Sequence, residues 1–124
     1  MRRYDENKAI GDRGEALVAD SLENDGFSIL ARNYKKQFGE IDIIAQRGEL
    51  IAFVEVKTRV KYIFDLTELI TLVKQKRIIA AAKAYIAERA GKQNIYRFDV
   101  ALIEDVDAGK ISYIPNAFTE EERY

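Results

Sequence analysis

The chain has 124 residues and a formal net charge of −1, with 48% hydrophobic and 33% charged residues. This composition is that of an ordinary globular protein, and the length fits one domain, residues 1–124, with enough buried surface for a core. The absence of cysteine and histidine excludes disulfides, thiolate metal clusters and histidine-based catalytic triads. Any metal site must therefore use oxygen ligands, which favour Mg²⁺, Mn²⁺ or Ca²⁺ over Zn²⁺.

The chain shows no sign of export or membrane insertion. No apolar run follows Arg2 and Arg3, and no stretch approaches the length of a membrane span. We therefore expect a cytoplasmic protein with no membrane partner, and the sequence is compatible with a homodimer. The mild acidity counts weakly against a dedicated nucleic-acid binder, which is usually basic. Metal-binding carboxylates would themselves lower the net charge, however.

The first predicted element is a helix over about residues 6–25, with Gly26 as the residue that ends it. Its apolar residues recur at helical spacing and form one arc. They are Ile10, Leu17, Val18 and Leu22.

Three strands are predicted next, over residues 27–34, 40–46 and 50–58, because these stretches are rich in β-branched and aromatic residues. Arg47-Gly48 is typical of a tight turn between the last two strands.

A second helix is predicted from its N-cap Thr71 to about Arg89, with Gly91 just past its end. Strands follow at about 95–103 and 110–114, with a turn at 107–109. The remaining residues, 116–124, are expected to form a short acidic helix. A long helix before the fourth strand favours a crossover connection and hence a mixed sheet.

The hairpin of the second and third strands carries the candidate chemistry. Strand side chains alternate between faces, so Glu40 and Asp42 share one face, as do Phe53, Glu55 and Lys57. A turn at Arg47-Gly48 would place Asp42 opposite Phe53 and diagonal to Glu55 on that face. The opposite face would be apolar, with Ile41, Ile43, Val54 and Val56.

Carboxylates this close repel one another unless a positive charge lies between them. A divalent cation bound by Asp42 and Glu55 would supply that charge, and Lys57 would orient a water and offset charge at a phosphodiester. The alternative is a solvent-facing strand with cross-strand ion pairs. Acidic and lysine residues are depleted inside apolar strands, which gives Glu55-Val56-Lys57 its weight.

Two residues on the helices bear on this choice. Glu15 lies at the edge of the apolar arc of the first helix, from where it could reach the sheet as a third carboxylate; the alternative is a solvated charge. Lys74 lies on the inward stripe of the second helix, in the first turn, where the helix dipole disfavours a cation. Such a position suggests contact with a phosphate, and the alternative is a lysine that extends past the stripe into water.

Basic residues gather near these positions, with aromatic residues between them, as expected for a surface that follows a phosphate backbone and stacks on bases. The alternative is a solvated face of ion pairs. This group comprises Lys57, Arg59, Lys61, Lys74, Lys76, Arg77 and Lys83, with Tyr62 and Phe64. The predicted nucleic-acid contacts are Arg13, Arg59, Lys74, Lys76 and Arg77.

Several motifs in this order resemble the YraN-like family of uncharacterised bacterial proteins. They are Gly11-Asp12-Arg13-Gly14-Glu15, Arg32-Asn33-Tyr34, Gly39-Glu40-Ile41-Asp42, Phe53-Val54-Glu55-Val56-Lys57, Lys74-Gln75-Lys76-Arg77, Arg97-Phe98-Asp99-Val100 and Asn116-Ala117-Phe118. That family is similar in turn to Holliday-junction resolvases and the PD-(D/E)xK nuclease superfamily.

The resemblance implies an α/β restriction-endonuclease-like core, with a mixed sheet flanked by helices in the order α-β-β-β-α-β-β. It also implies Glu15, Asp42 and Glu55 as metal ligands and Lys57 as the catalytic lysine. The chain departs from the pattern in having Ile41 where a proline often precedes the aspartate, and in lacking a glycine after Phe64.

These patterns favour the hypothesis of a Mg²⁺- or Mn²⁺-dependent nuclease that acts on DNA, such as branched or repair intermediates. One alternative is a non-catalytic nucleic-acid-binding or interaction domain that keeps the fold. Another is a scaffold protein with no role on nucleic acid. Metal binding would distinguish the nuclease from the scaffold protein. Metal-dependent cleavage would distinguish the nuclease from the non-catalytic binding domain.

Overall fold

The computed structural model describes residues 2–58, 66–89 and 93–120. Its elements are α1 (Arg2–Asn24), β1 (Ser28–Lys36), β2 (Gly39–Arg47), β3 (Leu50–Thr58), α2 (Leu66–Leu69), α3 (Leu72–Glu88), β4 (Ile95–Asp105) and β5 (Lys110–Phe118). The five strands form one sheet in the order β1-β2-β3-β4-β5. Among the strands of the described residues, only the β3–β4 pair is parallel, and α3 lies in the connection between these two strands.

This architecture confirms the predicted α/β class, the mixed sheet and the element order α-β-β-β-α-β-β, with the short helix α2 added before α3. It is consistent with a restriction-endonuclease-like core. The crossover arises because parallel strands cannot be joined by a tight turn, so the chain must return along the sheet before β4 begins.

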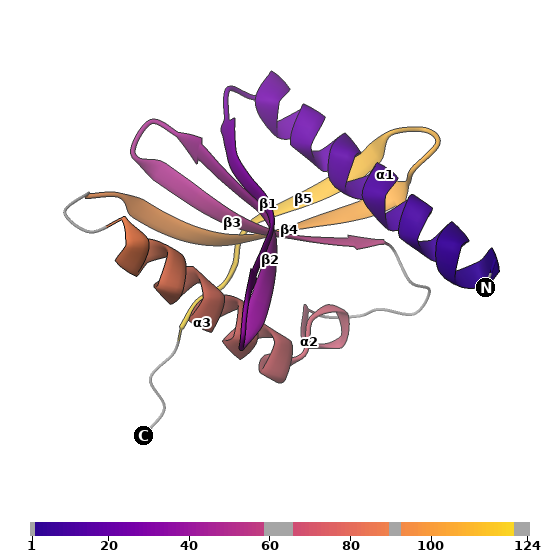
Figure 1. Ribbon diagram of the computed structural model, residues 1–124. Coiled ribbons are helices and arrows are strands. Elements are labelled where there is room, and N and C mark those ends of the chain that lie inside the picture. Colours follow the sequence, from indigo (N-terminus) through magenta and orange to yellow (C-terminus); the bar gives the residue numbers. More distant parts are fainter. Residues whose placement is uncertain (1, 59–65, 90–92, 121–124) are drawn as a thin grey trace.

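The sheet lies between α1 on one face and α3 on the other (Figure 1). Apolar residues of α1, including Val18 and Leu22, pack on Ile43 and Val54 from the sheet. On the other side, Ile78 and Ala82 of α3 pack on Ile44, Phe53 and Val100. Both faces of the central strands are buried, so β2 and β3 are nearly continuous apolar runs. Asp42 interrupts the run in β2, and Glu55 interrupts it in β3.

The helix ends follow the local signals in the sequence. Gly26 has a φ of +88°, the left-handed conformation that glycine adopts without strain, and it ends α1 as predicted. Thr71 caps α3, and its hydroxyl oxygen accepts a hydrogen bond from the backbone amide of Lys74 at 3.2 Å. The predicted position of Gly91 lies outside the described residues.

The predicted turn between β2 and β3 was wrong by one residue. Arg47 pairs with Leu50, so the turn residues are Gly48 and Glu49, and Gly48 takes the positive φ of +60°. Each residue of β2 therefore pairs with a residue of β3 that lies two positions further along the chain than predicted. A displacement of two does not by itself move a side chain to the other face, because the side-chain period of a strand is two.

Two further predictions are corrected. Ile41 lies in the α3-side cluster with Ile44, whereas Ile43 lies on the α1 side, so the alternation of β2 breaks next to Asp42. The other residues predicted for that apolar face, Val54 and Val56, do pack on the α1 side. The chain from Asn116 to Phe118 continues β5 and does not begin a helix. In the described part of the chain, no helix combines the length and the apolar composition of a membrane span.

Candidate functional site

The sheet opens between β2 and β3 at Asp42. Regular pairing of these strands extends to Ile43 and Val54, and continuing that register would place Asp42 opposite Glu55. Instead, the Asp42 carboxylate accepts a hydrogen bond from the backbone amide of Val56 at 2.8 Å. The side chain thus takes the place of a backbone carbonyl and fixes the position where the two strands diverge.

Glu55 lies beside Asp42 and is 5% exposed. Burial, followed by the hydrogen bond and the charge of Asp42, raises the pKa of Glu55 from 4.5 to about 9, against the opposing effect of Lys74 and Lys57. Two buried carboxyl groups that share a hydrogen bond cannot both ionise readily without a cation between them. One oxygen, Glu55 Oε2, is buried and has no hydrogen-bond partner among the described residues.

Glu15 approaches the same opening from α1. Its Oε1 atom is also buried without a hydrogen-bond partner in the described part of the chain. Burial is the main cause that raises the pKa of Glu15, and the charge of Asp42 adds to it, while Arg32 acts in the opposite direction. Asp42 thus interacts with Glu55 and with Glu15.

Two lysines accompany the carboxylates. Lys74 Nζ lies 3.8 Å from Glu55 Oε2, with the lysine side chain 42% exposed, so the cation bridges the buried acid and the solvent. Lys57 is half-buried, and its charge also favours the ionised form of Glu55. The structure therefore brings Asp42, Glu55, Lys57 and Lys74 together.

The donor set can be tested against a divalent cation. Among the described residues, no three acidic side chains lie close enough to form a preformed metal-binding group. Magnesium, however, is typically held by one or two carboxylates, with water and substrate phosphate as the other ligands. Asp42 and Glu55 fit that pattern, because both are oxygen donors and one buried oxygen of Glu55 accepts no hydrogen bond from the described residues. Glu15 lies near enough to Asp42 for their charges to interact, but it does not complete a three-carboxylate group with them among the described residues.

The predicted nucleic-acid contacts are not all brought together. Arg13 forms an ion pair with Asp107, at 2.8 Å, beside the β4–β5 turn. Arg77 lines a small cavity together with Lys74, whereas Lys76 lines a different cavity on the other side of α3. Arg59 lies outside the described residues. Arg77 is therefore the predicted contact that shares a surface with Lys74.

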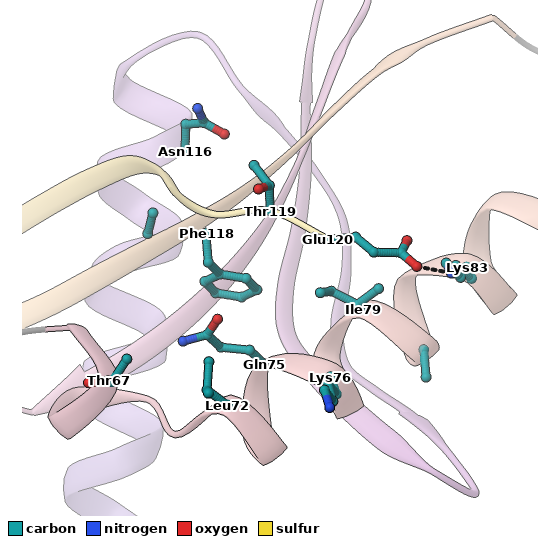
Figure 2. Close-up of a pocket in the computed structure, with 12 residues that line it drawn as sticks. Thr67, Leu72, Gln75, Lys76, Ile79, Lys83, Asn116, Phe118, Thr119 and Glu120 are labelled. Atoms are coloured by element: carbon teal, nitrogen blue, oxygen red, sulfur yellow. Dashed lines mark hydrogen bonds and ion pairs between the residues drawn. The ribbon is translucent and has the colours of Figure 1, made fainter. Parts of the chain in front are cut away.

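Lys76 and Lys83 lie in a groove of about 670 Å³ between α3 and the end of β5. Figure 2 shows Phe118, Gln75 and Leu72 lining this groove, and Lys83 reaching Glu120. The groove is larger than the cavity of about 290 Å³ that Lys74 and Arg77 line, but none of Asp42, Glu55 or Lys57 lines it. Size alone therefore does not locate the site.

A basic cavity of about 290 Å³ was not anticipated as a unit. It lies between the β1–β2 hairpin and α3, and its lining residues are Lys35, Lys36, Gly39, Glu40, Lys74 and Arg77. The sequence signal that could have found it is the pair Lys35-Lys36 at the end of a strand, four residues before Glu40. The sequence gives no sign, however, that this turn meets α3.

Asp99 is a third buried acid among the described residues, and the sequence patterns assigned it no role. It is 0% exposed. Arg97 donates two hydrogen bonds to it, at 2.7 and 2.9 Å, and the Tyr113 hydroxyl and the Asn116 amide donate two more. These four hydrogen bonds occupy both carboxylate oxygens of Asp99. The carboxylate therefore fixes β5 on β4 and has no free oxygen for a ligand.

Comparison with known proteins gives a consistent family. The model of an uncharacterised protein family, UPF0102, matches residues 14–103. A UPF0102 protein of Dictyoglomus thermophilum is 45% identical over 116 residues, covering 90% of this chain and 98% of the relative. A UPF0102 protein of Clostridium perfringens is 44% identical over 122 residues, covering 95% and 98%, and one of Alkaliphilus metalliredigens is 41% identical over 113 residues, covering 90% and 99%.

Proposed function

The chain belongs to the uncharacterised protein family UPF0102, and on that premise we propose that it is a Mg²⁺- or Mn²⁺-dependent nuclease acting on DNA phosphodiesters, such as branched or repair intermediates. The observation that carries the proposal is the buried contact of Asp42 with Glu55 at the opening of the sheet, with Lys57 and Lys74 beside it. An acid with so strongly raised a pKa, next to a second acid and two lysines, is characteristic of functional sites.

The proposed roles follow from position. Asp42 and Glu55 would hold the cation, and Glu15 would support it from α1. When bound, such a cation polarises the scissile phosphate and lowers the pKa of an attacking water. Lys57 would orient that water and offset the charge that develops on the phosphate. Lys74, which is half-exposed, would contact a phosphate oxygen of the substrate.

The test is a cleavage panel of linear duplex, single-stranded, flapped and four-way DNA, with Mg²⁺ or Mn²⁺ and with a chelator. Asp42→Asn and Glu55→Gln should abolish metal-dependent cleavage, whereas Asp20→Asn, an exposed acid on α1, should not. If the purified wild-type protein cleaves none of these substrates with either metal, the nuclease proposal fails.

A second candidate is a non-catalytic nucleic-acid-binding domain. The observation that favours it is the ion pair between Lys74 and Glu55, which compensates the buried acid without a metal. This reading predicts metal-independent DNA binding and no cleavage in the same panel.

A further inference from the structure

We propose that the basic cavity between the β1–β2 hairpin and α3 binds a backbone phosphate of the nucleic-acid strand that enters the Asp42–Glu55 site. This cavity is here called the hairpin pocket and is lined by Lys35, Lys36, Gly39, Glu40, Lys74 and Arg77. The inference rests on the proposed function only for the identity of the ligand, a nucleic acid. It requires neither a metal nor cleavage.

The charge of the hairpin pocket differs from that of the chain. The whole protein has 20 basic and 21 acidic residues, yet four of the six residues that line the pocket are basic and only Glu40 is acidic. Like charges held this close repel one another unless an anion lies among them. Arg77 makes no ion pair among the described residues, so its guanidinium is available for a phosphate.

The other cations are held only partly by the protein's own acids. The Nζ atom of Lys35 lies 3.8 Å from Glu40 Oε2, and 72% of the Lys35 side chain is exposed. The Nζ atom of Lys74 lies 3.8 Å from Glu55 Oε2. Lys36 is paired more closely, at 2.7 Å from Glu88. At 3.8 Å the ammonium groups are beyond good hydrogen-bonding distance, and they keep donors for a ligand.

The backbone holds the two sides of the pocket in place. A Cβ atom at Gly39 would overlap the backbone oxygen of Arg77, so the hairpin contacts α3 where only glycine fits. This contact sets Lys35 and Lys36 across from Lys74 and Arg77. The cavity, about 290 Å³, has the volume of roughly ten water molecules at about 30 Å³ each, which is ample for a phosphate with part of its hydration shell.

Lys74 joins the hairpin pocket to the candidate site, because it lines the pocket and also approaches Glu55. A strand whose phosphate lies in the pocket would therefore run past the carboxylates. The pocket would position the substrate and would not take part in bond cleavage.

The test uses two matched pairs of variants of the full chain. Arg77→Ala is compared with Lys76→Ala, its neighbour on α3, which lines the other groove. Lys36→Ala is compared with Lys83→Ala, since both lysines are ion-paired and neither pair is buried. Each pair removes one positive charge from the pocket or from outside it.

The measurement is fluorescence anisotropy of a labelled DNA duplex, and of one of its strands alone, titrated with protein at several salt concentrations in chelator. Arg77→Ala and Lys36→Ala should weaken binding and should each make the negative slope of log K against log salt shallower by about 1, while Lys76→Ala and Lys83→Ala should leave the slope unchanged. Circular dichroism of each variant checks that it is folded, and an alanine variant that is not folded is replaced by the glutamine variant at the same position.

Equal losses in both members of each pair would overturn the proposal, because they would reflect net charge alone. Absence of DNA binding by the wild-type protein at low salt would overturn it as well. If the variants differ in DNA binding as expected but the wild-type protein cleaves no DNA of the panel, only the nuclease function is contradicted.

Discussion

The carboxylate of Asp42 replaces a backbone acceptor by taking a hydrogen bond from the Val56 amide at 2.8 Å. The strand-to-strand ladder therefore ends on a side chain that also lies against Glu55. The residue that opens the sheet is thus the one that the proposed metal site needs. Its structural and functional contributions can be separated by substitution.

Asp42→Asn keeps an oxygen acceptor for the Val56 amide and removes the charge, whereas Asp42→Ala removes both. We expect the alanine variant to unfold more easily than the asparagine variant, by about 1–3 kcal/mol, because it leaves a partly buried amide without a partner. Urea unfolding of both in chelator measures the difference. Equal stabilities would mean that the hydrogen bond contributes nothing.

The stability of the metal-free protein should fall as pH rises. The pKa of Glu55 is raised from 4.5 to about 9 in the folded protein by burial and by Asp42, so the folded state holds a proton that the unfolded chain has lost. The stabilisation is complete below pH 4.5 and is lost up to about pH 9, with a slope of up to about 1.4 kcal/mol per pH unit.

Glu55→Gln removes this titrating group, so its unfolding free energy should depend less steeply on pH across that window. Urea unfolding in chelator at several pH values gives the two slopes. Parallel curves for the wild type and Glu55→Gln would show that Glu55 ionises normally in the folded protein.

Divalent metal should raise the melting temperature, because it binds the folded state and not the unfolded one. At a metal concentration of about 100 Kd the linkage stabilises by about 2.7 kcal/mol, which corresponds to several degrees for a chain of this size. Thermal melts with Mn²⁺ measure the shift. It should vanish in Asp42→Asn with Glu55→Gln and should persist in Asp20→Asn with Glu23→Gln, which changes the charge equally on exposed α1 residues.

Lys57 and Lys74 should differ in kinetics. Lys57→Ala should lower single-turnover cleavage at saturating protein by about 10²- to 10³-fold while DNA and metal binding are largely kept, because its contact is made mainly in the transition state. Lys74→Ala should instead weaken DNA binding and make the negative slope of log K against log salt shallower by about 1. An equal loss of binding in both variants would make Lys57 an electrostatic anchor.

Gly39→Ala should destabilise the fold by about 1–3 kcal/mol, since its new methyl group would meet the backbone oxygen of Arg77. Gly11→Ala is the matched control, because a Cβ at that helical position meets nothing within 4 Å. That variant should gain about 0.5–1 kcal/mol from helix propensity. A Gly39→Ala protein as stable as the wild type would contradict the close contact of hairpin and helix.

The sequence by itself determined most of the helices and strands and most faces of the central strands. Thr71 and Gly26 mark helix ends through local hydrogen bonding and backbone conformation, and these signals need no distant partner. Glu55 and Lys57 were predicted on one face from the alternation of side chains within a single strand, which does not depend on the pairing with β2, so the displaced turn at Gly48 had no effect on it.

Only the tertiary structure decided which elements meet. Ile41 changed faces because the Asp42 side chain, and not a carbonyl, takes the Val56 amide, which interrupts the regular alternation of β2. The hairpin pocket exists because Gly39 lies against the backbone of Arg77, 38 positions further along the chain. Lys76 and Arg77 are neighbours in sequence, yet they line different cavities, because adjacent helical residues point in different directions.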